Sequence, residues 1–183
     1  MDGEHVHDDT VTSLGITEPG NMNVDLLFDW VSRLRRNKGK DIFRTKGVFS
    51  IAGRDEKFVY QGVHMVWDGD YHEPWGTNEP RVNKLTFIGK HLDHKGLKES
   101  FMECLDTPEN MTKRFGSPLR FAVGGKVLCN MGSFWATGLV VKCAYFTGKG
   151  IAPYQVRLDE SGGQYAGMLI MARHDNDSVI RAA

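Results

Sequence analysis

The stretch from Ile42 to Trp67, IFRTKGVFSIAGRDEKFVYQGVHMVW, is the most hydrophobic long segment in the first two thirds of the chain. Small or apolar residues run from Val48 to Ala52, the polar run GRDE follows at 53–56, and β-branched and aromatic residues resume from Lys57 to Trp67. Apolar runs of this length, bounded by turn residues, indicate two strands joined by a tight turn. We therefore predict that this hairpin forms the centre of a β-sheet.

Further strand and helix signals flank the hairpin. Residues 11–16 and 82–89 have strand patterns. Asn23 is a suitable N-cap for a helix whose apolar residues recur every three to four positions and which Gly39 would end. Asp93 is expected to cap a second, shorter helix. We predict an α+β fold, with a mainly antiparallel sheet and two helices on one face in a ferredoxin-like arrangement.

The pattern changes after residue 120 to short strands and turns, which are typical of a small barrel. Residues 107–119 contain the segment TPENMTKRFGSP, which has the composition of a linker. We predict a polar tail at 1–10, the α+β domain at 11–106, the linker at 107–119 and an all-β barrel of SH3 or Tudor type at 120–183.

Charge and cysteine content restrict the class of protein. The 183 residues carry no net charge, although residues 1–110 have 14 Lys/Arg against 19 Asp/Glu and residues 111–183 have 9 against 4. The lack of a net charge makes nucleic acid an unlikely partner, and the uneven distribution supports two units of opposite sign. The three cysteines lack a CxxC spacing, and no segment resembles a signal peptide or a membrane span. We expect a soluble, intracellular protein, cytoplasmic or organellar, without membrane insertion.

The motifs of common enzyme classes are missing. The chain has no GxxxxGK[ST] phosphate loop, no HExxH, no GxSxG and no GxGxxG dinucleotide fingerprint. No pair of its histidines and carboxylates has a spacing that would impose a catalytic geometry. We predict a binding or scaffolding module and no enzyme.

Two histidines near the N-terminus are candidate metal ligands. His5 and His7 lie beside Asp8 and Asp9, and imidazole and carboxylate groups both bind Zn²⁺. A His-x-His tail of this kind binds metal only weakly on its own, and a solvated tail is the simpler interpretation. We predict no cofactor in this chain beyond low-affinity Zn²⁺.

Five further residues are candidates for an interaction surface. Trp75 and Arg81 lie in the segment 69–81, which we expect to be a loop, and a tryptophan there either binds a partner or covers the edge of the sheet. His64 is predicted on a strand, where a histidine is more often a hydrogen-bonded core residue than a ligand. Trp135 and Tyr154 in the last third would form an aromatic cage or pack the barrel.

Several long motifs, in order, resemble the C-terminal domain of CobW-type GTPases, metallochaperones related to the HypB and UreG GTPases. The resemblance extends from His7 to about Leu105. It rests on HDDTVTSLGI, WVSRLRRNKGKDIFRTKGVFSIAG, KFVYQGVHMVWDG and PWGTNEPRVNKLTFIGKHLD. Residues from Arg120 onward resemble small β-barrel units of algal and protist proteins.

The resemblance implies an accessory role, because the family's GTPase domain and its Cys-x-Cys-Cys metal site are absent from this chain. The implied function is an interaction or regulatory module in metal homeostasis, with a client metalloprotein or a linked GTPase domain as partner. Two alternatives remain open. One is a structural or assembly subunit of a larger complex, and the other is a Tudor-like module that recognises a modified peptide or nucleic acid.

Overall fold

The computed structural model describes residues 11–183, which form two compact units that divide between Asp106 and Thr107. The first unit contains β1 (Val11–Pro19), α1 (Val24–Lys38), β2 (Ile42–Ser50), β3 (Glu56–Val63), β4 (Val66–Pro74), β5 (Val82–Lys90) and α2 (His94–Met102). The second contains α3 (Pro108–Phe115), β6 (Lys126–Asn130), β7 (Trp135–Phe146), β8 (Ile151–Leu158), η1 (Glu160–Tyr165), β9 (Leu169–Ala172) and β10 (Ile180–Ala182).

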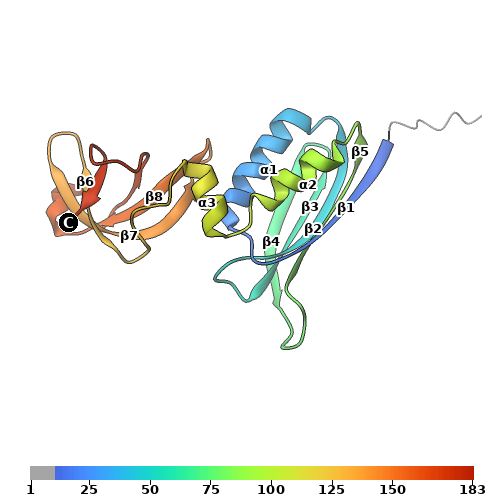
Figure 1. Cartoon of the computed structure of the whole chain (residues 1–183), viewed down its shortest axis with the longest axis horizontal. Helices are drawn as coiled ribbons and strands as arrows, with labels where there is room; N and C mark the ends of the chain where they lie inside the picture. Colours follow the sequence, from blue (N-terminus) through green and yellow to red (C-terminus); the bar gives the residue numbers. More distant parts are fainter. Residues whose placement is uncertain (1–10) are drawn as a thin grey trace, which may run out of the picture. The chain divides into compact units, whose positions relative to one another are not determined.

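The first unit is built on an antiparallel sheet with the strand order β1-β5-β2-β3-β4 (Figure 1). Strand β2 lies in the middle of this order, which confirms the prediction for the 42–67 segment. Strands β1 and β2 are joined through α1 and separated by β5, which pairs antiparallel with both of them. This split β-α-β arrangement is the one on which ferredoxin-like folds are based, and β3 and β4 extend the sheet beyond β2.

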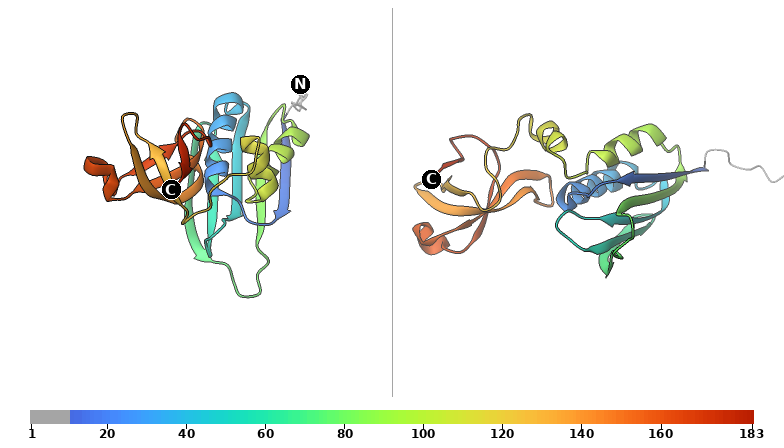
Figure 2. Two further views of the ribbon diagram at one scale, coloured as in Figure 1. Left: turned by 60° about the vertical axis from the view of Figure 1, so that its left-hand side comes forward. Right: turned by 60° about the horizontal axis from the view of Figure 1, so that its bottom comes forward.

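Both helices of the first unit cover the same face of the sheet, as predicted (Figure 2, right). The Trp30 ring of α1 lies 6.2 Å from the Phe87 ring of β5, and the Phe101 ring of α2 lies 5.6 Å from the Phe49 ring of β2. These side chains are almost completely buried. Their apolar area, removed from water, is the main source of stability for this layer.

The helix starts agree with the capping signals in the sequence. The side chain of Asn23 accepts hydrogen bonds from the N–H groups of Asp25 and Leu26, and that of Asp93 accepts one from Gly96. Each cap satisfies N–H groups that have no partner inside the helix. The two helices therefore begin where the sequence predicts them to begin.

The prediction of one strand from Lys57 to Trp67 was wrong. The chain turns at residues 64 and 65, so this segment contributes to two strands, β3 and β4. His64 takes a left-handed conformation with φ of 49°, so the turn is made without a glycine or proline to signal it. Strand β4 then continues to Pro74. The segment 69–81 is consequently half strand, and only the part from Trp75 onward is a loop.

The second unit is a five-stranded antiparallel sheet with the order β10-β6-β7-β8-β9. Strand β10 pairs with β6, and β6, β7, β8 and β9 follow one another as an antiparallel meander. Val127, Tyr154, Val156 and Ile180 are fully buried and form part of its core. The structure therefore has the predicted fold class, an α+β unit followed by a β-rich unit.

The segment predicted as a linker contains the helix α3. Thr107 caps it by accepting a hydrogen bond from Asn110 N–H, Pro108 occupies its first turn, and Gly116 ends it with φ of 78°. Its Pro, Gly and polar residues thus serve as helix start and stop signals.

None of the described helices is long and apolar enough to cross a membrane.

Candidate functional site

The loop between β4 and β5 is fastened at both ends to the turn between β2 and β3. Trp75 N–H donates to the carbonyl oxygen of Asp55 at 2.9 Å. Arg81 donates from Nη1 to the Arg54 carbonyl at 3.0 Å and from Nη2 to Asp55 Oδ1 at 2.7 Å. The structure therefore brings together two of the predicted site residues, Trp75 and Arg81, against one turn.

A lysine from β3 links this loop to the sheet. Lys57 Nζ lies 5.3 Å from the centroid of the Trp75 ring, 2.9 Å from Glu79 Oε2 and 3.5 Å from Glu73 Oε1. Its hydrogen bond to Glu79 raises the pKa of Lys57, and the backbone N–H of Gly76 lowers the pKa of Glu79. All of these groups are therefore charged at neutral pH. Because solvent-exposed ion pairs add little stability, the main effect of the cluster is to fix the position of Trp75.

The Trp75 ring borders a hollow on the face of the sheet opposite the helices. The hollow has a volume of about 340 Å³ and an apolar floor of valines from three strands. Trp75 Nε1 is buried and has no hydrogen-bond partner among residues 11–183. A buried donor without an acceptor is energetically unfavourable. We call this hollow the Trp75 hollow; Val48, Lys57, Val59, Glu73, Trp75, Glu79, Pro80, Val82 and Lys84 line it.

His64 lies elsewhere, at the opposite end of the β3–β4 hairpin from Trp75. It is exposed, its N–H donates to the Phe43 carbonyl at 3.0 Å, and its carbonyl accepts from Trp67 Nε1. The interpretation of His64 as a core residue was therefore wrong. Exposed apolar side chains flank it at Val63 and Met65.

Trp135 and Tyr154 lie in the second unit and do not form a cage. Tyr154 is completely buried; its hydroxyl donates to Asp175 Oδ2 at 2.6 Å and accepts from Phe121 N–H at 3.2 Å. It supports the core and presents no surface to a partner. The half-buried Trp135 ring is covered by the Arg181 guanidinium, whose carbon lies 4.0 Å from the ring centroid.

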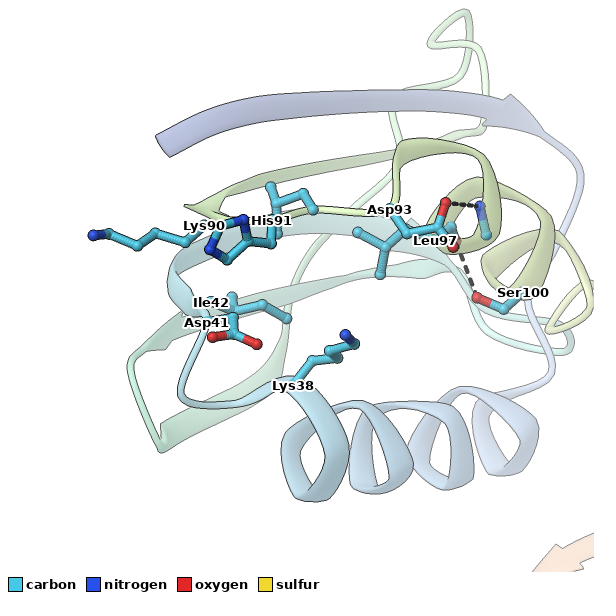
Figure 3. Close-up of a pocket in the computed structure, with 10 residues that line it drawn as sticks. Lys38, Asp41, Ile42, Lys90, His91, Asp93, Leu97 and Ser100 are labelled. Atoms are coloured by element: carbon cyan, nitrogen blue, oxygen red, sulfur yellow. Dashed lines mark hydrogen bonds between the residues drawn. The ribbon is translucent and has the colours of Figure 1, made fainter. Parts of the chain in front are cut away.

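A second pocket in the first unit, of about 190 Å³, lies between the end of α1 and the start of α2 (Figure 3). Lys38, Asp41, Lys90 and His91 contribute its polar wall, and apolar side chains such as Leu97 its floor. It mixes positive and negative groups without a clear preference for either sign of ligand.

The predicted metal ligands His5 and His7 lie outside the described residues. Among residues 11–183, no group of three or more His, Cys, Asp or Glu side chains could hold a metal ion. None of the three cysteines forms a disulfide, and burial raises the pKa of the Cys129 thiol to about 11, so this thiol is a poor ligand at neutral pH. The described residues therefore do not fit a resident metal.

Some residues of the Trp75 hollow were not predicted from the sequence. Lys57 is one member of an apolar strand pattern, and Glu73 and Glu79 belong to a polar segment rich in such residues. Their convergence depends on the register of β3 against β4 and on the return of the loop to the sheet. No sequence spacing signals it.

The fold and the match to a family model together define the class of this protein. Residues 11–105 match the family of the Cobalamin synthesis protein cobW C-terminal domain. Because the match spans more than half of the 183 residues, the chain belongs to this family. The resemblance inferred from its motifs is thus confirmed, and the family's GTPase domain is not part of this chain.

Individual relatives are similar over part of the chain. The zinc chaperone YjiA of Escherichia coli K12 is 29% identical over 75 residues, which are 39% of this chain and 23% of that protein. The zinc chaperone CobW of Pseudomonas aeruginosa is 31% identical over 65 residues, which are 36% of this chain and 17% of that protein. The chain thus spans less than a quarter of the length of these relatives.

Solved structures agree with the fold. The Zn(II)-bound YjiA GTPase from E. coli superposes with a TM-score of 0.50 and 21% identity, covering 52% of this chain and 30% of that one. A triple mutant of the same GTPase gives the same score over 53% of this chain. At this identity, the likeness shows the fold alone.

Proposed function

We propose that this chain is a non-catalytic recognition module of a CobW-type metal-homeostasis system. It binds a client metalloprotein, or a GTPase domain that acts with it, through the Trp75 hollow. The observation that carries the proposal is the position of Trp75, which is held by a backbone hydrogen bond to Asp55 and by the charge cluster around Lys57, on the face of the first sheet opposite the helices.

The lining of the hollow suggests what a partner would present there. The negative charges of Glu73 and Glu79 are directed at Lys57, whereas the indole N–H of Trp75 has no partner among the described residues. The floor of Val48, Val59 and Val82 is apolar. An apolar side chain of a partner fits this floor, and tryptophan, the residue type of Trp75, is enriched at interface hot spots.

Photo-crosslinking inside the source cells tests this assignment. A benzophenone amino acid replaces the exposed Lys84, which lines the hollow; in a matched control, it replaces Lys95 on α2, whose side chain is 85% exposed. We expect the Lys84 position to capture a metalloprotein or a CobW-type GTPase that the Lys95 position does not capture. Trp75→Ala should lower that yield at least about ten-fold, as expected for a hot spot.

The assignment is wrong if both positions capture the same proteins with equal yield, or if Trp75→Ala leaves the yield unchanged. A separate titration of the purified chain with GTP and with Zn²⁺ tests its non-catalytic character. Tight GTP binding or GTP hydrolysis by the chain alone would contradict that part of the proposal.

A further inference from the structure

The two edges of the first sheet differ in charge. The edge strand β4 carries Asp68, Asp70 and Glu73, and acidic side chains on an edge discourage pairing with another copy of the same strand. The other edge strand, β1, has the sequence VTSLGITEP over nine residues. Its one charged residue, Glu18, forms an ion pair with Lys98 of α2 at 2.8 Å. Strand β1 therefore presents an edge without net charge.

The backbone geometry shows which groups of β1 point outward. Lys90, the β5 residue opposite Val11, donates its N–H at 2.8 Å to Asp41, just before β2, and so faces away from β1. In an antiparallel ladder, the bonded direction alternates from one residue to the next. The N–H and C=O groups of Val11, Ser13, Gly15 and Thr17 therefore point away from β5, and no other described strand pairs with them.

The course of the chain leaves this edge open along its length. After α2, residues 104–106 return beside residues 21–23, where Leu105 forms a bridge with Met22 and Asp106 N–H donates to Asn21. The chain then leaves the first unit. Within the described part of that unit, no strand occupies the position beside β1 at which a further strand would extend the sheet.

We propose that β1 pairs antiparallel with β1 of a second copy of this chain, so that the two first-unit sheets become continuous. A two-fold axis near Leu14 places neutral Val, Ser, Gly and Thr residues opposite one another. No like charges meet there, whereas pairing through β4 would oppose carboxylates. Residues 11, 13, 15 and 17, whose backbone groups point outward, are all exposed. This surface is separate from the Trp75 hollow.

Sedimentation equilibrium of the full chain tests the proposal. We expect wild-type protein to dimerise at micromolar concentration. Ser13→Pro should raise the dimer dissociation constant at least about ten-fold, because proline removes an outward N–H without breaking a bond to β5. Ser13→Ala keeps this N–H and should dimerise like the wild type.

Charge variants keep the proposal testable if Ser13→Pro fails to fold. Ser13→Lys and Ser13→Glu should each be mostly monomeric because like charges meet near the two-fold axis. An equimolar mixture of the Ser13→Lys and Ser13→Glu variants should form a heterodimer, with a dissociation constant similar to that of the wild-type dimer. A wild-type chain that stays monomeric to about 100 μM, within the typical range of specific association, would overturn the proposal. Single-charge variants that dimerise like the wild type would also overturn it.

Discussion

At the scale of single residues, Asp175 is the centre of a hydrogen-bond network in the second unit. Its carboxylate accepts from the Tyr154 hydroxyl at 2.6 Å, from Arg120 Nε at 2.7 Å and from Arg120 N–H at 3.0 Å. Arg120 also donates to the Ile180 carbonyl at 2.8 Å. These bonds join the segment before β6, which contains Arg120, to strand β8 and to the last strand, β10.

This network predicts a pH-dependent stability of the second unit. Partial burial opposes ionisation of Asp175, but the hydrogen bonds from Tyr154 and Arg120 outweigh it, so the pKa of Asp175 lies below its usual value. A lowered pKa adds stability above the unfolded-state pKa of about 3.9, and this stability is lost as the pH falls through the folded-state value. Hydrogen exchange of second-unit amides should therefore accelerate as the pH falls below about 4, relative to unstructured reference peptides.

Asp175→Asn should remove most of this acid dependence and destabilise the second unit at neutral pH. Asp177→Asn is the matched control, since that carboxylate contacts only the exposed side of Arg120 and its side chain is 80% exposed. Equal acid dependence in wild type and Asp175→Asn would contradict the assignment.

At the scale of elements, the most deeply buried side chain of α2 is an aromatic ring that packs against both the sheet and α1. Phe101 is completely buried, and its ring centroid lies 5.5 Å from that of Trp30 and 5.6 Å from that of Phe49. A hydrogen bond from Trp30 Nε1 to Ser100 Oγ at 3.0 Å joins the same two helices. The position of α2 thus depends on contacts that converge on one turn.

Phe101→Ala should lower the free energy of unfolding of the first unit by about 3–5 kcal/mol, as large-to-small changes of buried aromatic residues do. Urea unfolding monitored by tryptophan fluorescence measures this loss. Met102→Ala, one position further along α2 at a residue 37% exposed, is the matched control and should cost far less. Similar losses for the two variants would show that α2 is not anchored through Phe101.

At the scale of the whole molecule, the chain consists of two units, each with its own buried core. Only the first matches the family of the cobW C-terminal domain. Because compact units with separate cores can in principle fold alone, we expect residues 1–106 and residues 107–183 to fold when expressed separately. Each should unfold cooperatively in urea, and the two transitions together should reproduce that of the full chain. A fragment that stays unfolded under native conditions would contradict this expectation.

The sequence predicted part of the candidate site for a physical reason. Trp75 and Arg81 stand out because large aromatic and cationic side chains in a polar segment are unusual. Lys57, Glu73 and Glu79 do not stand out, since charged residues are common on any exposed strand or loop. Tyr154 was proposed for a surface because an aromatic residue in a strand pattern does not reveal which face it occupies until the register is known.

The sequence by itself determined the family, the α+β class, the helix starts and the central place of the 42–67 segment. These features depend on local periodicity and capping, which neighbouring residues encode. Only the tertiary structure decided the turn at His64, the uncharged open edge at β1 and the hollow beside Trp75. Each depends on how distant segments pair, and strand register and loop closure are set by contacts across the whole fold.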